Sequence, residues 1–256
     1  MHGAVLGNTP PSNQTKVTMK RNVLISAFAL LAASVLVADT NPKDTVIATA
    51  RKLAVADNYS WTTTVTVPEG SRFHPGPTEG KTEKNGLSRV TMSFRDETTG
   101  MALKCDKDAV KPPDGDWQSL SELANTEGGE RFLVMVARGF KAPATQAWEL
   151  ISGTKELKLT DVVYSDDLTE DGAKAMLRFW PRRSGEPEIS NAKGSVEFRV
   201  MGRSLSTNEF SVRGGINFND EERDSQRITT VELRDVGTTK VTVSEDAKKS
   251  SLEHAP

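Results

Sequence analysis

Few residues in this chain have side chains that commonly do acid–base, nucleophilic or zinc chemistry. The 256-residue sequence contains one cysteine, Cys105, and beyond residue 38 only two histidines, His74 and His254. One thiol cannot form a disulfide within the chain, and the usual zinc sites need several Cys or His ligands. A nucleophilic triad would depend on His74 alone, because no Gly-x-Ser-x-Gly or His-Glu-x-x-His motif is present. Cys105 and Leu103 are expected on the same, apolar face of a strand, which favours a buried structural thiol at Cys105. These residues weigh against an enzyme.

Two further patterns resemble binding motifs without completing them. Residues 76–82, GPTEGKT, are similar to the end of a phosphate-binding loop, but Pro75 stands where the first glycine is required and no helix is expected after Lys81. We expect Ser71–Gly80 to be a surface loop. Acidic clusters occur at Asp106/Asp108, Asp114/Asp116, Asp166/Asp167 and Asp220/Glu221/Glu222/Asp224, none with the spacing of a calcium-binding loop. Such clusters at turns are ordinarily solvated. No cofactor and no metal site is predicted.

Charge is divided unequally at residue 38. Three of the 33 basic residues and none of the 35 acidic ones precede this point, which leaves 30 basic against 35 acidic residues in the remaining body. A nucleic-acid partner is therefore not expected, because phosphate neutralisation needs a basic excess. The body is long enough for one sizeable core.

A secretory signal is predicted at residues 19–38. Lys20 and Arg21 precede an almost wholly aliphatic run that ends at Ala38 and is shorter than the roughly 20 residues that span a bilayer. Cleavage after Ala38 would give an exported bacterial protein, periplasmic or secreted, with no stable membrane span; an uncleaved anchor is the alternative. Residues 1–18 fit no signal architecture and are expected to be a disordered upstream extension, with translation starting at Met1 or Met19.

The first two thirds of the body mix helices and short strands. Asn41 and Pro42 predict the start of a helix over 42–56, and alternation from Tyr59 to Val67 predicts a strand. Thr169 is expected to cap a later helix that ends before Pro181. Further helices are expected at 117–124, at 132–137 and from Pro143, with strands at 90–94, 102–105, 109–110, 157–159 and 162–164.

The last third alternates apolar and polar residues most clearly. The apolar positions are Val196, Phe198, Val200, Phe210, Val212, Ile216, Phe218, Val231, Leu233, Val241 and Val243. Charged residues occupy the other face, namely Glu197, Arg199, Glu209, Arg213, Glu232 and Arg234. One apolar and one charged face is typical of an antiparallel sheet with one side in water. We expect a single α+β domain over 39–246, with helices on the apolar face of the sheet, followed by a polar tail over 247–256.

The order of these elements, with the export signal and the ending TTVELRDVGTTKVTV at 229–243, resembles the LolA-like superfamily of periplasmic lipoprotein carriers and related lipid-binding lipoproteins. The resemblance covers mainly Gly194–Asp246. It implies a strongly curved antiparallel sheet that forms an open half-barrel with helices as a lid. The absence of a lipobox cysteine implies a soluble carrier, and no site residue is carried over. The chain is also similar to exported bacterial proteins of unassigned function.

The leading hypothesis is a non-catalytic binder of an apolar ligand such as a lipid or acyl chain. The side chains expected to line its cavity are Phe132, Met135, Val136, Phe140, Trp148, Met176 and Phe179. The alternative is that they only cover the sheet, in which case the protein is a structural or protein-interaction module of the cell envelope with a fully packed core. A hydrolase with an unrecognised site is a third hypothesis.

Overall fold

The computed structural model describes residues 41–71, 74–94, 97–104, 108–126, 130–178, 188–218 and 221–252. All of them belong to one compact unit, Asp39–Pro256. The predicted signal, Cys105 and Phe179 lie outside the described residues. Within these ranges, no helix has both the length and the apolar character needed to span a membrane.

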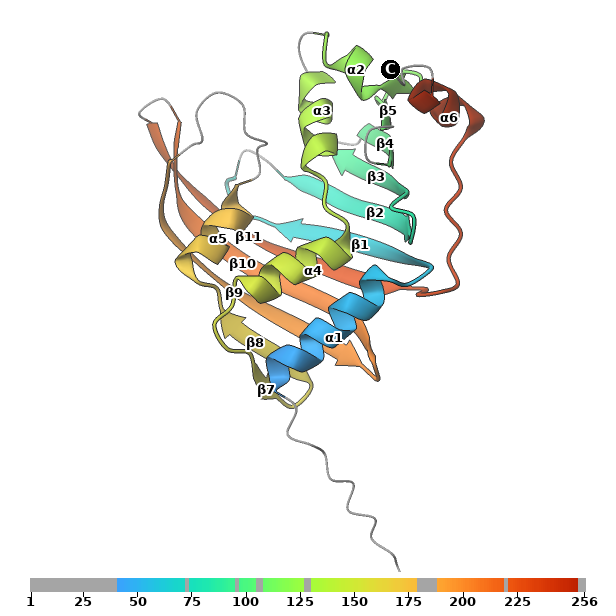
Figure 1. The fold of residues 1–256 in the computed structure, drawn as a ribbon. Coiled ribbons are helices and arrows are strands. Elements are labelled where there is room, and N and C mark those ends of the chain that lie inside the picture. Colours follow the sequence, from blue (N-terminus) through green and yellow to red (C-terminus); the bar gives the residue numbers. More distant parts are fainter. Residues whose placement is uncertain are drawn as a thin grey trace, which may run out of the picture. The chain divides into compact units, whose positions relative to one another are not determined.

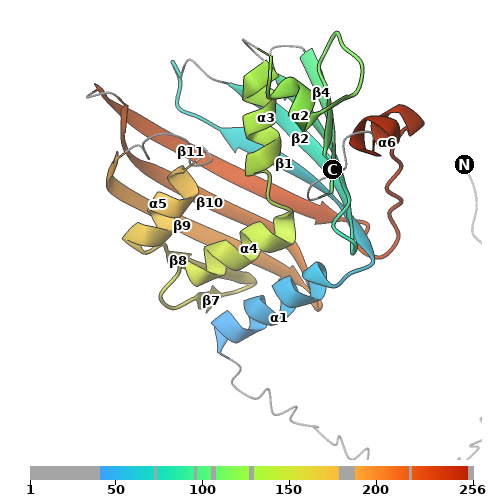
Figure 2. The ribbon, with the colours of Figure 1, turned by 45° about the horizontal axis from the view of Figure 1, so that its top comes forward.

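The fold is built on one antiparallel sheet, which has eleven strands in the described part of the chain. Their order is β6-β5-β4-β3-β2-β1-β11-β10-β9-β8-β7. The strands are β1 (Asn58–Thr66), β2 (Pro75–Glu83), β3 (Ser88–Phe94), β4 (Glu97–Leu103), β5 (Ala109–Lys111), β6 (Gln118–Ser119), β7 (Lys158–Thr160), β8 (Val163–Asp167), β9 (Glu188–Met201), β10 (Ser204–Phe218) and β11 (Glu221–Arg234). The sheet is strongly curved and does not close on itself (Figures 1 and 2). This confirms the predicted α+β class with a half-barrel-like sheet.

Six helices accompany the sheet in the described ranges. They are α1 (Pro42–Ala54), α2 (Leu120–Leu123), α3 (Glu130–Gly139), α4 (Pro143–Ser152), α5 (Glu170–Leu177) and α6 (Glu245–Leu252). α1 packs on α4 and β10, whereas α5 packs on β9 and β10 (Figure 1). α3 and α6 contact β5 in the other half of the sheet. α1, α3, α4 and α5 therefore cover the apolar face, as predicted, and supply buried residues of the core.

Local signals in the sequence determine where two of these helices begin. The Asn41 side chain accepts a hydrogen bond from the backbone N–H of Lys43 at 2.9 Å, and Pro42 takes the first helical position of α1. Thr169 Oγ1 accepts from the N–H of Gly172 at 3.0 Å and caps α5. Both caps are those that the sequence predicted.

The two faces of β9, β10 and β11 divide as the alternation predicted. Val196, Phe198, Phe210, Val212 and Val231 point to the inner, helix-covered face and are at most 3 % exposed. The charged residues predicted for the opposite face alternate with them along the strands and are exposed or half-buried.

The largest difference from the prediction is β2, which lies inside the sheet where a surface loop was expected. β2 pairs with β1 on one side and β3 on the other. Its Gly80 lies directly opposite Trp61, and a Cβ at Gly80 would come within 2.1 Å of the indole. Glycine here allows the indole to lie on the strand, so the residue that suggested a loop is a packing requirement.

Two differences concern the C-terminal end. Val241 and Val243 alternate as in a strand, but residues 239–244 form none. α6 then occupies part of the segment expected to be a polar tail. Its Ala247 is fully buried, and Ser250 Oγ donates a hydrogen bond to the Trp117 carbonyl at 2.8 Å.

Candidate functional site

The inner face of the sheet is buried at one end and only half-buried at the other, and this change occurs on five adjacent strands. On β1, for example, Tyr59 and Trp61 are 2 % and 4 % exposed, whereas Thr63 and Val65 on the same face are half-buried. The register places the half-buried residues of all five strands toward the same end of the sheet. We call them the open end: Thr63, Val65, Thr78, Met92, Ile216, Ser225 and Arg227.

The cavity-lining residues predicted from the sequence are divided among three helices. On α3, Phe132, Met135 and Val136 are half-buried, and Val136 packs against the main core. Phe132 and Met135 do not belong to the described side chains that pack against that core. α3 therefore presents apolar surface that the core does not use.

The remaining predicted lining residues have different surroundings. Phe140, which follows α3, stacks on Trp61 with ring centroids 5.9 Å apart. Trp148 on α4 is 42 % exposed and lies beneath the guanidinium of Arg51, 5.5 Å from the ring centroid. Met176 on α5 is buried. The described members of the predicted set therefore come from α3, α4, α5 and the residue that follows α3.

Arg227 is the charged member of the open end. It lies opposite the buried Val212, and Ser225 and Thr229 flank it on the same face of β11. Its guanidinium donates a hydrogen bond to the carbonyl of Met176 in the last turn of α5. Burial lowers the pKa of Arg227. Sequence reasoning missed this residue, although it lies four residues before Val231 and therefore on the same, inner face of the strand.

A second polar side chain lies deeper on the same face. Asn208 on β10 is 0 % exposed, between Phe198 of β9 and Val231 of β11 in the register. Neither its amide oxygen nor its amide nitrogen has a hydrogen-bond partner in the described part of the protein. An unpaired buried amide destabilises the folded state.

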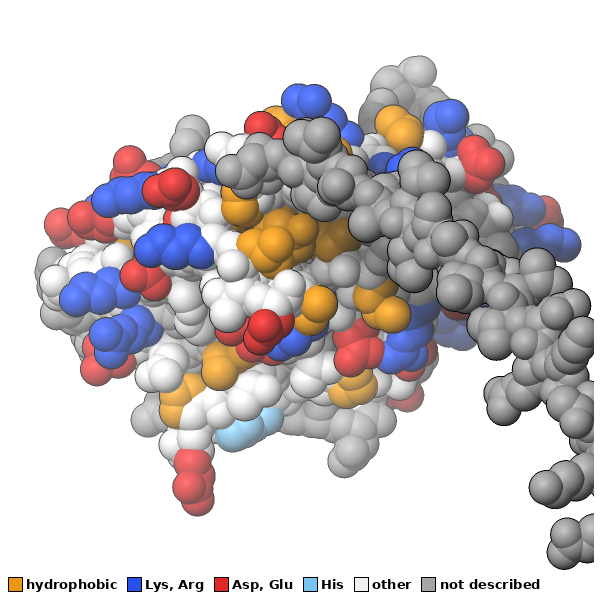
Figure 3. Space-filling model, turned by 90° about the horizontal axis from the view of Figure 1, so that it is seen from below, with side chains coloured by type: hydrophobic (Ala, Val, Ile, Leu, Met, Phe, Trp, Pro, Cys, Tyr) orange, Lys and Arg blue, Asp and Glu red, His pale blue; other side chains and the backbone are white. Residues whose placement is uncertain are grey.

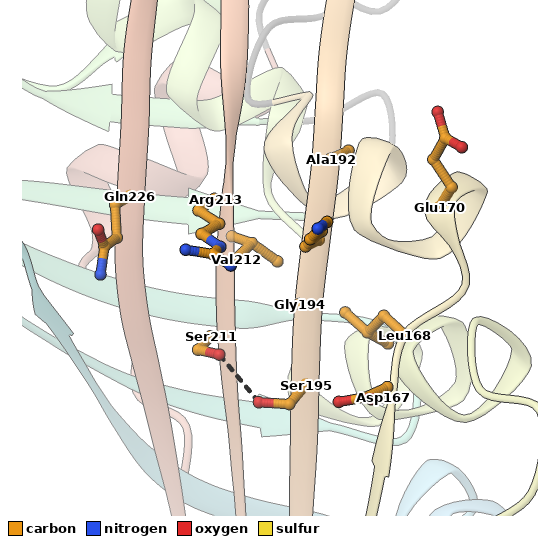
Figure 4. Close-up of a pocket in the computed structure, with 11 residues that line it drawn as sticks. Asp167, Leu168, Glu170, Ala192, Gly194, Ser195, Ser211, Val212, Arg213 and Gln226 are labelled. Atoms are coloured by element: carbon orange, nitrogen blue, oxygen red, sulfur yellow. Dashed lines mark hydrogen bonds between the residues drawn. The ribbon is translucent and has the colours of Figure 1, made fainter.

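A separate, polar pocket of about 550 Å³ lies over β9–β11 beside the connection from β8 to α5 (Figure 4). Ser195 and Ser211 in this pocket are hydrogen-bonded to each other at 2.9 Å. Lys193 and Arg213 lie opposite each other across β9 and β10 and also line it. No imidazole is among the described residues that line this pocket, so neither serine has a histidine base among them.

The acidic clusters were expected at turns, but Asp166 and Asp167 belong to β8 and Asp224 belongs to β11. Asp166 accepts hydrogen bonds from the backbone N–H groups of Lys155 and Glu156, at 3.0 and 2.8 Å. Asp108 accepts from the N–H of Lys104 at 2.6 Å. Among the described residues, no group of three or more His, Cys, Asp or Glu side chains could hold a metal ion.

Some large apolar side chains are exposed on the surface. Leu159 (48 %) and Val162 (64 %) belong to β7 and the β7–β8 turn, and Met201 (74 %) precedes the β9–β10 turn. Figure 3 shows one face of the molecule on which hydrophobic side chains gather between charged ones.

Comparison with known proteins finds similarity only among solved structures. No family model and no curated protein matches the chain. The Mycobacterium tuberculosis lipoprotein LppX is 13 % identical, with a TM-score of 0.42 over 79 % of this chain and 98 % of its own. LprF from Mycobacterium bovis is 10 % identical, with a TM-score of 0.42 over 80 % of this chain and 96 % of its own. Similarity at this level assigns no function to the chain.

Proposed function

We propose that this protein is an exported, non-catalytic binder of an apolar ligand, such as a lipid or acyl chain, which lies against the open end of the sheet. The observation that carries the proposal is the loss of cover along the inner face on five adjacent strands. A sheet that served only as one wall of a packed core would be covered along its whole inner face. Here Val65, Met92 and Ile216 remain half-buried on that face.

Half-buried apolar side chains occur both on the open end and on α3, and they suit an elongated apolar molecule. Phe132 and Met135 on α3 supply half-buried apolar surface outside the main core. Methionine side chains adapt to ligands of varied shape, and ligand sites are usually apolar with a few polar groups. The hydroxyls of Thr63 and Thr78 supply such polar groups. The pocket over β9–β11 is lined by Leu168, Ala192 and Val212 together with polar and charged side chains.

The first test is lipid extraction and mass spectrometry of the protein purified from its own host. A co-purifying lipid or acyl compound is the expected result. The site is then tested with N-phenyl-1-naphthylamine, a neutral apolar probe that fluoresces when bound. Thr63→Trp fills the open end and should weaken probe binding about tenfold, roughly what the loss of one or two buried methylene contacts does.

Thr64→Trp is the matched control, because Thr64 is the next residue of β1 and lies exposed on the outer face. It should leave probe binding unchanged. Equal effects of the two substitutions would place the probe elsewhere. Absence of both a co-purifying ligand and probe binding would overturn the proposed function.

The exposed apolar side chains favour a second candidate, a protein-interaction module of the cell envelope. Val162 and Met201 are the most exposed of them. If they contact a partner protein, Val162→Ser with Met201→Ser should abolish recovery of a defined partner from envelope extracts while leaving probe binding intact. Recovery that is unaffected by the double substitution would reject this candidate.

A further inference from the structure

Arg227 differs from most of the described charged side chains of the long strands in the direction it faces. Arg223, opposite Ile216, lies on the same face of β11 but is exposed, whereas Arg227 is half-buried. Glu209, Arg213 and Glu232 lie on the outer face. Arg227 lies on the inner face, directly opposite Val212 of β10. Charged side chains are rarely buried unless they are paired, because desolvation of the charge is unfavourable. Its position therefore requires a compensating interaction.

The described structure supplies only part of that compensation. The guanidinium donates one hydrogen bond, to the carbonyl of Met176. This carbonyl lies in the last turn of α5, where carbonyls lack partners within the helix. A guanidinium has five N–H donors, and a neutral carbonyl carries no countercharge. Among the described residues no carboxylate forms an ion pair with Arg227, and the ion pairs between described residues, such as Lys141–Glu149, lie on exposed or half-buried side chains.

The position of Arg227 within the open end indicates where the missing anion comes from. Ser225 and Ile216 of the open end lie on the same face of β11 and the neighbouring β10. A ligand whose apolar part lies on the open end would bring its polar end within reach of this part of the sheet. The planar fork of arginine binds carboxylate and phosphate oxygens through two parallel hydrogen bonds.

We propose that the guanidinium of Arg227 binds the oxyanion head group, carboxylate or phosphate, of an amphiphilic ligand whose apolar chain occupies the open end. This inference rests on the proposed function and narrows its ligand from any apolar molecule to an acidic amphiphile. The carbonyl of Met176 fixes the guanidinium from the α5 side and leaves the other N–H groups for the ligand.

The experiment compares three ligands with the same sixteen-carbon chain by displacement of N-phenyl-1-naphthylamine: palmitate, hexadecyl phosphate and neutral hexadecanol. Arg227→Met removes the charge and keeps an unbranched apolar side chain. It should weaken one or both acidic ligands about tenfold or more, the range of charge-assisted hydrogen bonds, and change hexadecanol by less than about twofold. The acidic ligand that loses more identifies the head group.

Arg213→Met is the matched control, because Arg213 is an exposed arginine on the outer face of the adjacent strand. It should leave all three ligands unchanged. Arg227→Lys keeps the charge without the fork and should restore part of the affinity, which also guards against a folding defect in the methionine variant. Equal binding of palmitate, hexadecyl phosphate and hexadecanol to the unaltered protein, or an equal loss of all three in Arg227→Met, would overturn the inference and leave the proposed function standing. Failure of all three ligands to displace a bound probe would also overturn the inference, whereas the proposed function falls only if the probe itself does not bind and no ligand co-purifies.

Discussion

Gly80→Ala should destabilise the protein more than any ordinary Gly→Ala substitution in a strand. A Cβ at Gly80 would lie 2.1 and 2.2 Å from Cζ2 and Cε2 of Trp61. The indole cannot easily move aside. It is 4 % exposed, its N–H donates to Thr82 Oγ1 at 3.3 Å, and it stacks on Phe140 at 5.9 Å. Relief of the collision must displace the indole, the strand, or both.

The magnitude follows from what that displacement disrupts. Overpacking of a core ordinarily destabilises by about 1–3 kcal/mol. Loss of the aromatic pair adds about 0.5–1.5 kcal/mol, and the hydrogen bond to Thr82 adds a similar amount. We therefore expect the free energy of unfolding to fall by about 3 kcal/mol, and the Tm to fall by about 6–12 °C for a body of this size.

Urea and thermal denaturation, followed by circular dichroism, measure both quantities. Gly100→Ala on β4 is the matched control, because its nearest neighbour would be Trp117 at an ordinary 3.4 Å. It should change the unfolding free energy by less than about 1 kcal/mol. In a Trp61→Leu background, Gly80→Ala should lose most of its effect, because the two sites interact directly. An unfolding free energy within about 0.5 kcal/mol of the unaltered protein for Gly80→Ala alone would refute this reasoning.

Three further predictions concern polar side chains. Asn208→Leu should raise the unfolding free energy by about 1–3 kcal/mol in urea denaturation, because it removes an unpaired buried amide; a decrease would show that the amide has a partner. Thr169→Ala should lower it by about 1 kcal/mol through loss of the α5 cap, and no change would contradict the cap. Lys174 lowers the pKa of Glu170 by a hydrogen bond and by its charge. The stabilisation from this pair is present above the unfolded pKa of the carboxyl and is lost as the pH falls through the lower folded pKa. Lys174→Met should therefore raise the pKa of Glu170 toward 4.5 in an NMR titration, and an unchanged value would reject the coupling.

The sequence predicts those parts of the fold whose signals are local. The alternation of apolar and polar residues from Val196 to Leu233 indicates which residues of the three long strands face inward. The cap at Thr169 is also local, because its hydroxyl accepts a hydrogen bond from Gly172, only three residues along the chain. β2 was wrongly predicted because Gly80 is explained only by Trp61, a contact made between strands. The alternation at Val241 was misleading because alternation does not specify a neighbouring strand, and residues 239–244 pair with none.

The candidate site is harder to predict for a related reason. Parity with Val231 indicates that Arg227 faces inward, but which end of the inner face remains uncovered depends on where α1 and α4 pack. The seven predicted lining residues were chosen for their apolar character on helices. Half-burial on the strands, as at Val65 and Ile216, has no counterpart in the sequence.

The strand order has a consequence for how the chain folds. Every neighbouring pair in the sheet joins consecutive strands except β1 and β11. At that single junction, Ser60 Oγ donates to Asp235 Oδ2 at 2.6 Å across a separation of 175 residues. The strands from β1 to β6 can form as local hairpins, but the edge of β1 stays unpaired until β11 has been synthesised. An unpaired edge invites aggregation, and closing so long a loop is slow. We therefore expect β1–β6 and β7–β11 each to fold fast and the pairing of β1 with β11 to be rate-limiting. A chain that is held unfolded until its synthesis is complete would not expose the unpaired edge of β1.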